Sequence, residues 1–341
     1  MALLLTSCRT KEDIRTPYGP FYLDGLVEQV VSERQFSEVS YEKLFTIPAT
    51  NDVFLYDPTV TIIDDHGYIH VMDHGARKVL RFSPTGEYLT SYGEDGRGQG
   101  PGEIVHIGAF GVMGDSMVYV MDAYDYKVAY FSIDGVFQKE KPERAQPWRY
   151  EQTATGREYV LFSYSDPRLP LLETRFGNRS TKVISFPDLV GNETDMLTSG
   201  DIKAYGENLL YVLHRYPLLL QYEPDGSLVY ARATVDYNDN FRKPEIEETI
   251  LGEMQVQRVV GRSLYSIPLS IENNELFVLA VNPAGAPDTS AFGAFDVYDA
   301  RNGDYQYSLS LPEKGRYYTT VHNGKVYQTQ DSTVVVWEMK W

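Results

Sequence analysis

Cysteine is almost absent from this chain, and long apolar runs are missing altogether. The 341 residues include one cysteine, which excludes an intramolecular disulfide and a zinc site built on paired thiolates. No window reaches the 18 or more apolar residues that a membrane-spanning helix needs. Basic residues are scarce as well, with 31 Lys and Arg against 48 Asp and Glu, a net charge of −17. Phosphate-binding surfaces need clustered basic side chains, so nucleic acid is not an expected partner.

Motifs for common cofactors and nucleophiles are missing too. The glycine-rich run 93–102 matches neither the dinucleotide-binding nor the P-loop pattern, and it leads toward a strand instead of a helix. No Gly-x-Ser-x-Gly elbow occurs, so nothing supports acyl transfer through an activated serine. We therefore expect no cofactor and no catalytic residue, and an enzyme is the less favoured class.

Aromatic residues, in contrast, are abundant. The chain holds 27 Tyr, 15 Phe and 3 Trp, and 43% of its residues are hydrophobic. Apolar side chains offset the entropy lost on ordering, so this composition predicts a folded protein. The length suggests about two domains of roughly 150 residues, although closed all-β architectures often form one larger domain. Internal repeats therefore decide the domain organisation.

One repeat is visible in the first half of the chain. Residues 68–86 and 117–135 align with a shift of 49 positions and are identical at eight of 19. Unrelated segments would share about one identity, so a supersecondary unit has been copied. Each copy carries an aspartate at a predicted strand end, Asp73 and Asp122. A carboxylate that recurs in each unit is better explained by turn capping than by catalysis.

Apolar side chains within each copy alternate with a period of two, which is typical of strands. The runs 68–72 and 78–82 are rich in β-branched and aromatic residues. The second run meets Ser83-Pro84-Thr85-Gly86, in which proline presets φ and glycine allows a positive φ, as in a hairpin turn. Related turn sequences recur at 131–135, 222–226 and 298–303.

Repeated units of this kind predict an all-β fold, a six-bladed β-propeller with four-stranded antiparallel blades. The last unit has only three predicted strands, and its open edge would expose unpaired backbone amides. The N-terminal stretch 26–47 lies outside every unit, so we expect it to supply the missing strand and close the ring. Residues 21–341 then form a single domain. The predicted blades are 59–92, 107–141, 150–186, 201–235, 265–311 and 316–339.

Two segments depart from the strand pattern. Pro244 and the glutamates that follow it suit the first turn of a helix, and apolar residues come next at helical spacing. We expect one short helix over 244–251, between the fourth and fifth blades. The stretch 166–200 is irregular, which leaves the third blade the least defined unit.

The residues of the first blade carry a family resemblance. Gly67–Asp73, Lys78–Gly86 and the glycine-rich Tyr92–Glu103 resemble an NHL repeat. The chain looks still more like the TolB-like six-bladed propeller lipoproteins of Gram-negative envelopes, most clearly over residues 59–135. The resemblance implies a propeller fold and a cell-envelope protein that binds a ligand or serves as a scaffold. It implies no particular reaction.

The single cysteine, Cys8, fits this resemblance. It follows a Leu-Thr-Ser triplet, which is similar to the lipobox of bacterial lipoproteins, where the signal peptide is cleaved before a cysteine that receives a lipid. The five apolar residues at the start are fewer than the roughly 7–15 of a signal peptide, so we interpret 1–20 as the end of a longer signal, the lipidation site and a tether. The alternative is a chance cysteine. The lipid would be the only membrane attachment, on an undetermined leaflet.

A propeller brings two sets of loops onto one face around its channel, those joining second and third strands and those joining consecutive blades. Arginine binds carboxylates through paired hydrogen bonds, and aromatic faces stack on sugars or peptide side chains. This face would suit a small anionic or carbohydrate-like ligand, or an envelope protein. Alternatively, Arg77 and similar residues pair with turn carboxylates such as Asp73. The candidate ligand-binding residues are His74, Arg77, Arg97, Tyr124, Tyr126, Trp148, Arg149, Arg168, His214, Arg215, Tyr216, Arg316 and Tyr317, with Arg262 in a further linker.

Histidines recur every four residues from His66 to His74, a spacing that gathers metal ligands on a helix but not on a strand, turn and strand. We expect no metal site. Histidines of four predicted blades could meet only through folding, namely His70, His106, His214 and His322. The rival hypothesis is a metal-dependent lactonase- or lyase-type enzyme, as on related propellers. Its Ca²⁺ or Zn²⁺ would lie in the channel, near Glu151, Asp201 or Glu272.

Overall fold

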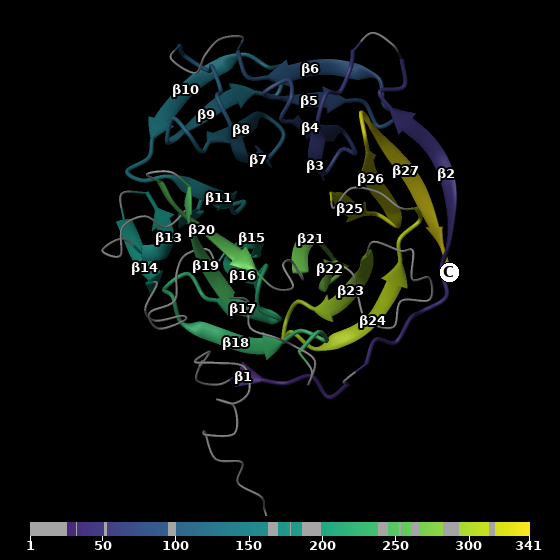
Figure 1. The fold of residues 1–341 in the computed structure, drawn as a ribbon. Coiled ribbons are helices and arrows are strands. Elements are labelled where there is room, and N and C mark those ends of the chain that lie inside the picture. Colours follow the sequence, from purple (N-terminus) through teal and green to yellow (C-terminus); the bar gives the residue numbers. More distant parts are fainter. Residues whose placement is uncertain are drawn as a thin grey trace, which may run out of the picture.

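Six antiparallel sheets stand around a common axis and form a closed ring (Figure 1). Each sheet is a blade, and its first strand lies nearest the axis. This arrangement confirms the predicted six-bladed propeller with four strands per blade. The computed structural model describes residues 26–31, 33–50, 53–94, 100–162, 170–177, 179–185, 199–237, 245–251, 254–260, 266–281, 293–313 and 318–341.

The first three blades follow one another along the chain with boundaries close to the predicted ones. Blade 1 contains β3 (Pro58–Ile63), β4 (Ile69–Asp73), β5 (Lys78–Phe82) and β6 (Tyr88–Tyr92). Blade 2 contains β7 (Ile107–Met113), β8 (Met117–Asp122), β9 (Lys127–Ser132) and β10 (Phe137–Pro142). Blade 3 contains β11 (Pro147–Gln152), β12 (Glu158–Phe162), β13 (Pro170–Phe176) and β14 (Arg179–Ser185).

The last three blades complete the ring, and the sixth takes its outer strand from the N-terminal part of the chain. Blade 4 contains β15 (Gly200–Tyr205), β16 (Asn208–Leu213), β17 (Leu218–Tyr222) and β18 (Leu228–Ala233). Blade 5 contains β21 (Ser266–Glu272), β22 (Glu275–Val281), β23 (Gly293–Asp299) and β24 (Tyr305–Ser310). Blade 6 contains β25 (Thr319–His322), β26 (Lys325–Gln330), β27 (Thr333–Lys340) and β2 (Ser40–Ile47).

The N-terminal segment 26–47, here called the strap, closes the ring as expected and does more. Its strand β2 pairs antiparallel with β27, while the short β1 (Leu26–Val27) pairs parallel with β18 at the rim of blade 4. Between them Phe36 forms a parallel bridge to Ser308 of blade 5. The strap therefore covers the outer edges of three consecutive blades, as its course along the rim in Figure 1 shows.

A buried ion cluster fixes the middle of the strap. Arg34 donates to both carboxylate oxygens of Asp296, at 2.9 and 2.8 Å, and to Asp236 at 2.6 Å. The side chain of Arg34 is 3% exposed and that of Asp296 2%. Such a buried pair is strongly destabilising to break from one side, because the remaining charge loses its partner. Arg34 therefore holds the strap to blades 4 and 5.

The predicted hairpin turns are confirmed at all four signatures. Gly86, Gly135, Gly226 and Gly303 have φ values of 88°, 89°, 93° and 73°. Each donates its N–H to the carbonyl three or four residues earlier, over 2.7–2.9 Å. These positive φ values are the ones that glycine adopts without strain.

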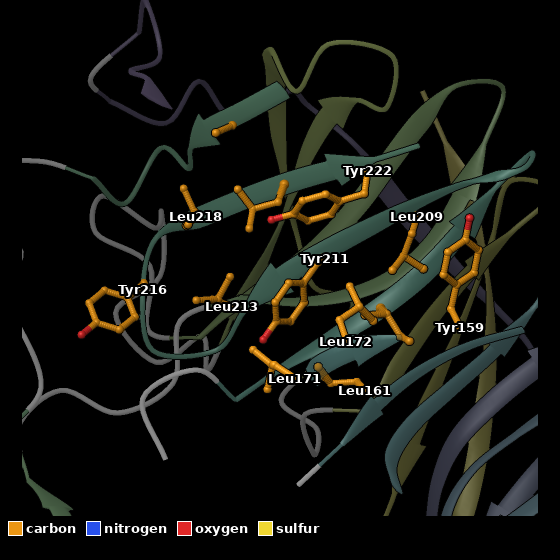
Figure 2. Close-up of a cluster of buried hydrophobic side chains, with 13 residues drawn as sticks. Tyr159, Leu161, Leu171, Leu172, Leu209, Tyr211, Leu213, Tyr216, Leu218 and Tyr222 are labelled. Carbon is orange, nitrogen blue, oxygen red and sulfur yellow. The ribbon is translucent and has the colours of Figure 1, made fainter. Parts of the chain in front are cut away.

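The hydrophobic core is divided among the blade interfaces. The described buried side chains form six clusters, and each joins two adjacent blades. Figure 2 shows the cluster between blades 3 and 4, in which Leu172 and Tyr159 pack against Leu209, Tyr211 and neighbouring side chains. Because the apolar side chains pack between blades, the axis of the ring is left available for a site.

The expected helix at 244–251 is wrong. Residues 245–251 form β19 (Glu245–Leu251), which pairs antiparallel with β20 (Met254–Val260) over seven residue pairs. Proline and glutamates favour a first helical turn locally, but the next segment alternates polar and apolar residues and offers a complementary strand. A hairpin satisfies the backbone of both segments at once. It is inserted between blades 4 and 5, and the described residues contain no helix.

Candidate functional site

A cavity of about 630 Å³ lies on the axis of the ring. The first strand of every blade contributes to its wall, from β3 through β25. Apart from Met72 on β4, its remaining wall residues come from loops that join second to third strands or one blade to the next, such as His74, His214 and Tyr318. The cavity therefore lies toward the face that carries these loops, which we call the cavity face. Its volume is in the range of typical small-molecule sites.

Buried aspartates shape the loops of blades 1 and 2 on this face. Asp73 accepts hydrogen bonds from the backbone N–H groups of Tyr56, Asp57 and Ala76, at 2.7–3.0 Å. Asp122 accepts four, from residues 105, 106, 124 and 125, at 2.6–3.3 Å. Each carboxylate ties the turn after a second strand to the linker before the first strand. The expected turn-capping role is confirmed.

These turns present a column of stacked rings at the cavity. His74 follows Asp73, and its imidazole stacks on His106 with the centroids 5.1 Å apart and an angle of 21°. His106 stacks in turn on Tyr124, at 4.7 Å and 19°. Both histidines line the cavity, whereas Tyr124 is 62% exposed. The column thus runs from the cavity wall to the surface.

Burial lowers the pKa of His74, and the neighbouring His106 acts in the same direction. Asp57 opposes this shift, and Arg149 adds to it. His74 is therefore a neutral ring near pH 7, able to donate one hydrogen bond and accept another. A neutral imidazole also stacks on its neighbour without charge repulsion.

The wall formed by blades 3 and 4 is ionic. Arg149 on β11 donates its Nε–H to Asp201 on β15, and Nε2 of His214 lies 2.6 Å from the second oxygen of Asp201. The Arg149 guanidinium also donates to the Trp148 carbonyl at 2.9 Å and lies 4.6 Å from the centroid of the indole. Burial raises the pKa of Asp201, but Arg149 and His214 outweigh this effect and lower the pKa below its ordinary value.

A second ion pair lies two residues further along the same two strands, β11 and β15. Nζ of Lys203 donates to Glu151 over 3.2 Å. Alternate residues of a strand share a face, so Arg149 and Glu151 of β11 point to the same side, as do Asp201 and Lys203 of β15. Along one strand the cation precedes the anion, and along the other the anion precedes the cation, so each charge faces an opposite one. The charges neutralise each other in part and remain along the cavity wall.

The opposite wall, from blades 6 and 1, carries hydroxyl groups. Thr59, Thr61, Thr319 and Thr320 line the cavity there. Thr61 and Thr319 are each 3% exposed, and within the described part of the chain their hydroxyls have no hydrogen-bond partner. The same holds for the indole Nε1 of Trp148 on the ionic side. Buried polar groups without partners are costly, and a bound ligand could satisfy them.

The structure brings five of the residues proposed from the sequence into this cavity: His74, Trp148, Arg149, His214 and Arg215. Tyr124 and Tyr126 are exposed on the same face. Arg77 is exposed as well, and among the described residues it forms no ion pair, because Asp73 is used by backbone N–H groups. Cys8, Arg97, Arg168, Arg262, Arg316 and Tyr317 lie outside the described residues.

Tyr216 is a correction to the expected ligand-binding set. It is 1% exposed and belongs to the cluster between blades 3 and 4, where Figure 2 shows it at one end of the group with Leu218 nearby. The loop after β16 has only four residues, 214–217, and its tyrosine packs into the cluster between the blades instead of facing a ligand. Arg215 and His214, which precede it, do line the cavity.

Sequence reasoning missed the threonines of β3 and β25 and gave His106, Asp201 and Glu151 only within metal hypotheses. One usable signal was the alternation of opposite charges on two first strands, Arg-x-Glu at 149–151 and Asp-x-Lys at 201–203. Threonines on strands gave no signal, because this residue is common in any β-structure.

The histidines do not gather as one set. His70 is fully buried and contacts Asp64 at 3.2 Å, and burial lowers its pKa. His322 lies near Glu272 at turns between first and second strands, on the face opposite the cavity face. In the described portion, no three His, Cys, Asp or Glu side chains are grouped to hold a metal ion.

No helix among the described residues is long and apolar enough to span a membrane.

Comparisons with known proteins agree with this fold. A family model described as a 6-bladed beta-propeller matches residues 28–168, and no curated protein matches the chain. A solved structure of a Bacteroides fragilis protein described as exported is 11% identical, with a TM-score of 0.56 over 92% of this chain and 98% of its own. A member of the DUF4221 family from Bacteroides vulgatus is 11% identical, with a TM-score of 0.61 over 89% and 99%.

An enzyme is also among the similar structures. A catalytically inactive variant of virginiamycin B lyase from Staphylococcus aureus, solved with quinupristin, is 9% identical, with a TM-score of 0.52 over 88% of this chain and 99% of its own. At such low identity the likeness extends to the fold alone. The comparisons therefore support the six-bladed propeller fold.

Proposed function

We propose that this protein is an exported, lipid-anchored propeller that binds a small anionic ligand in its axial cavity without transforming it. The observation that carries this proposal is the guanidinium of Arg149, which Asp201 and the Trp148 carbonyl hold in the cavity wall. Lys203 and Arg215 line the same cavity, on a chain whose net charge is −17. Cationic side chains gathered at one place on an acidic protein concentrate anions there.

The geometry suits recognition of a carboxylate. Arg149 is already oriented by Asp201 and by the Trp148 carbonyl, so little side-chain entropy is lost when a ligand binds. The neutral His74 and the indole N–H of Trp148 can donate hydrogen bonds to further acceptors of the ligand. A fixed guanidinium with several donors around it is a common arrangement for planar anions.

Calorimetric titration of the chain with a panel of small carboxylates, including sugar acids, tests the proposal. We expect at least one to bind, and Arg149→Gln to weaken it at least tenfold. Arg157→Gln is a matched control, because Arg157 pairs with Glu207 on a turn between first and second strands, at the opposite face. Equal binding by the wild type and Arg149→Gln would contradict the site, and an envelope protein that binds in place of every acid would contradict the ligand class.

A lyase- or hydrolase-type enzyme is the second candidate, and the pair of His214 with Asp201 favours it. An imidazole held by a carboxylate is a usual general base. Mass spectrometry of the bound acid after prolonged incubation separates the two candidates. A change of mass that disappears in His214→Ala would establish the enzyme, whereas an unchanged ligand agrees with the binder.

The membrane anchor is a separate proposal, supported by the Leu-Thr-Ser-Cys sequence and by the likeness to a protein described as exported. We expect Cys8→Ser to move the protein of the full-length gene from the membrane to the soluble fraction of a Gram-negative host. Thr6→Ala, which keeps the small residue of the pattern, is the control. Retention of Cys8→Ser in the membrane would contradict lipidation.

A further inference from the structure

Exposed aromatic side chains gather on the cavity face. Of the exposed large hydrophobic residues, five aromatics come from loops that lead into first strands or join second to third strands. These loops belong to neighbouring blades 6, 1 and 2. Exposed rings that share one side of a protein commonly mark a binding surface. The five residues are Phe54, Tyr56, Tyr124, Tyr126 and Tyr318.

This aromatic rim is continuous with the cavity. The column of His74, His106 and Tyr124 leads from the wall to a ring that is mostly exposed. Tyr56 lies beside the turn that carries His74, since a methyl group built on Gly75 would be 2.5 Å from the Cβ atom of Tyr56. A ligand that projects from the cavity along this column would therefore reach the exposed ring of Tyr124.

The buried hydroxyls indicate the chemistry of that ligand. Thr61 and Thr319 can each donate and accept a hydrogen bond, and so can the hydroxyl groups of a sugar. Aromatic rings stack on the apolar faces of sugars while the sugar hydroxyls stay solvated. An acidic peptide also supplies carboxylates and backbone hydrogen-bonding groups, so it is the competing ligand class that the experiment must separate from a sugar.

Resting on the proposed anion site, we propose that the ligand is an acidic oligosaccharide. Its terminal uronic acid occupies the cavity, with the carboxylate toward Arg149 and hydroxyls toward Thr61 and Thr319. The following sugars leave through the mouth and stack on Tyr124 and its neighbours. The cavity thus determines which terminal sugar is bound, and the rim makes an oligosaccharide bind more tightly than a single sugar.

Titration with four defined probes tests this inference: galacturonic acid, linear trigalacturonate, neutral maltotriose and a triglutamate peptide. We expect the trigalacturonate to bind at least tenfold more tightly than the single acid, and the other two to bind at least tenfold more weakly than the trigalacturonate. Tyr124→Ala should weaken the trigalacturonate about tenfold and leave the single acid unchanged. Tyr88→Ala is the control, because this exposed tyrosine lies on the outer strand β6.

Thr61→Val provides a second variant that should keep the fold, since it removes a buried hydroxyl that has no partner. It should weaken both acids severalfold. Binding of other carboxylates but of neither galacturonate would overturn the oligosaccharide while leaving the anion site. Equal affinity for the single acid and the trigalacturonate would contradict binding of further sugars by the aromatic rim. Tighter binding of triglutamate than of trigalacturonate would show that the ligand is an acidic peptide instead of a sugar. Failure of every carboxylate would overturn the proposed function itself.

Discussion

Blades 1 and 2 use their buried carboxylates differently from blades 3 and 4. Asp73 and Asp122 accept three and four backbone N–H groups, and neither lines the cavity. Glu151 and Asp201 lie on first strands instead and meet Lys203, Arg149 and His214 in the cavity wall. One pair of blades uses acid groups to hold its loops, and the other uses them to orient cations.

The comparison separates residues that make the fold from residues that make the site. Where two blades agree in sequence, as at Asp73 and Asp122, the shared side chain serves the backbone. In blade 4 the equivalent position at the end of β16 is Leu213, and the carboxylate that lines the cavity, Asp201, lies on the first strand. Blade 4 therefore lacks the capping carboxylate and has its acid group in the cavity wall instead.

The largest effect is expected from removing a capping carboxylate. Asp122→Ala leaves four backbone N–H groups without their acceptor, so we expect a loss of about 3 kcal/mol of unfolding free energy. Urea denaturation followed by tryptophan fluorescence measures it. Asp115→Ala in the same blade is the control and should change stability by less than about 0.5 kcal/mol, because Asp115 is exposed. Similar midpoints for both variants would erase the distinction between the two pairs of blades.

A smaller effect is expected for the cavity pair. A double-mutant cycle on Arg149→Gln and Asp201→Asn should give a coupling energy of roughly 1 kcal/mol in unfolding, because the pair is partly exposed and screened by solvent. The same two variants should lose ligand binding far more strongly than stability. A coupling as large as the loss in Asp122→Ala would mean that these carboxylates also serve the fold.

The loops of blades 1 and 2 can be compared directly at equivalent positions. Arg77 and Tyr126 have φ values of 55° and 51°, a left-handed conformation in which a side chain costs energy and glycine does not. We expect Arg77→Gly and Tyr126→Gly each to raise the unfolding free energy by up to about 1 kcal/mol. Tyr124→Gly, in the same turn without a positive φ, should lower it. Opposite signs for the two equivalent positions would show that the copies are not alike.

The smallest effect is expected for the pH dependence of stability. It concerns blade 1 alone of the two copies, because the position of His74 is occupied by Ala123 in blade 2. The folded pKa of His74 is lowered, so the unfolded chain takes up the proton more readily. The stability that the neutral His74 gives the folded protein is fully present above the unfolded pKa of about 6.5, and it is lost as the pH falls toward the folded pKa. Unfolding curves at pH 7.5 and 5.5 should therefore differ less in His74→Gln than in the wild type, and an equal difference would contradict this assignment.

Much of the fold could be predicted because strands leave a period of two and the repeat fixes their grouping. The blade limits, the turn glycines and the strand supplied by the strap all followed from those two signals. The helix over 244–251 was wrong because local preferences of Pro244 and the glutamates say nothing about the partner strand 254–260. Pairing between segments is a tertiary property that local patterns do not contain.

The site could be predicted only in part. Knowing which loops share a face was enough to select His74, Arg149 and His214. It could not tell that Tyr216 turns into the core, because burial depends on the neighbouring blade. Nor could it select Thr61, whose importance appears only when its missing hydrogen-bond partner is known.

Pairing of β2 with β27 has a consequence for how the molecule is made. The ribosome synthesises residues 40–47 long before their partners at 334–340. The ring therefore cannot close until β27 has been made, and such distant pairing is slow to form. The outer edge of β27 stays unpaired until β2 joins it, so the sixth blade is the last to gain its fourth strand.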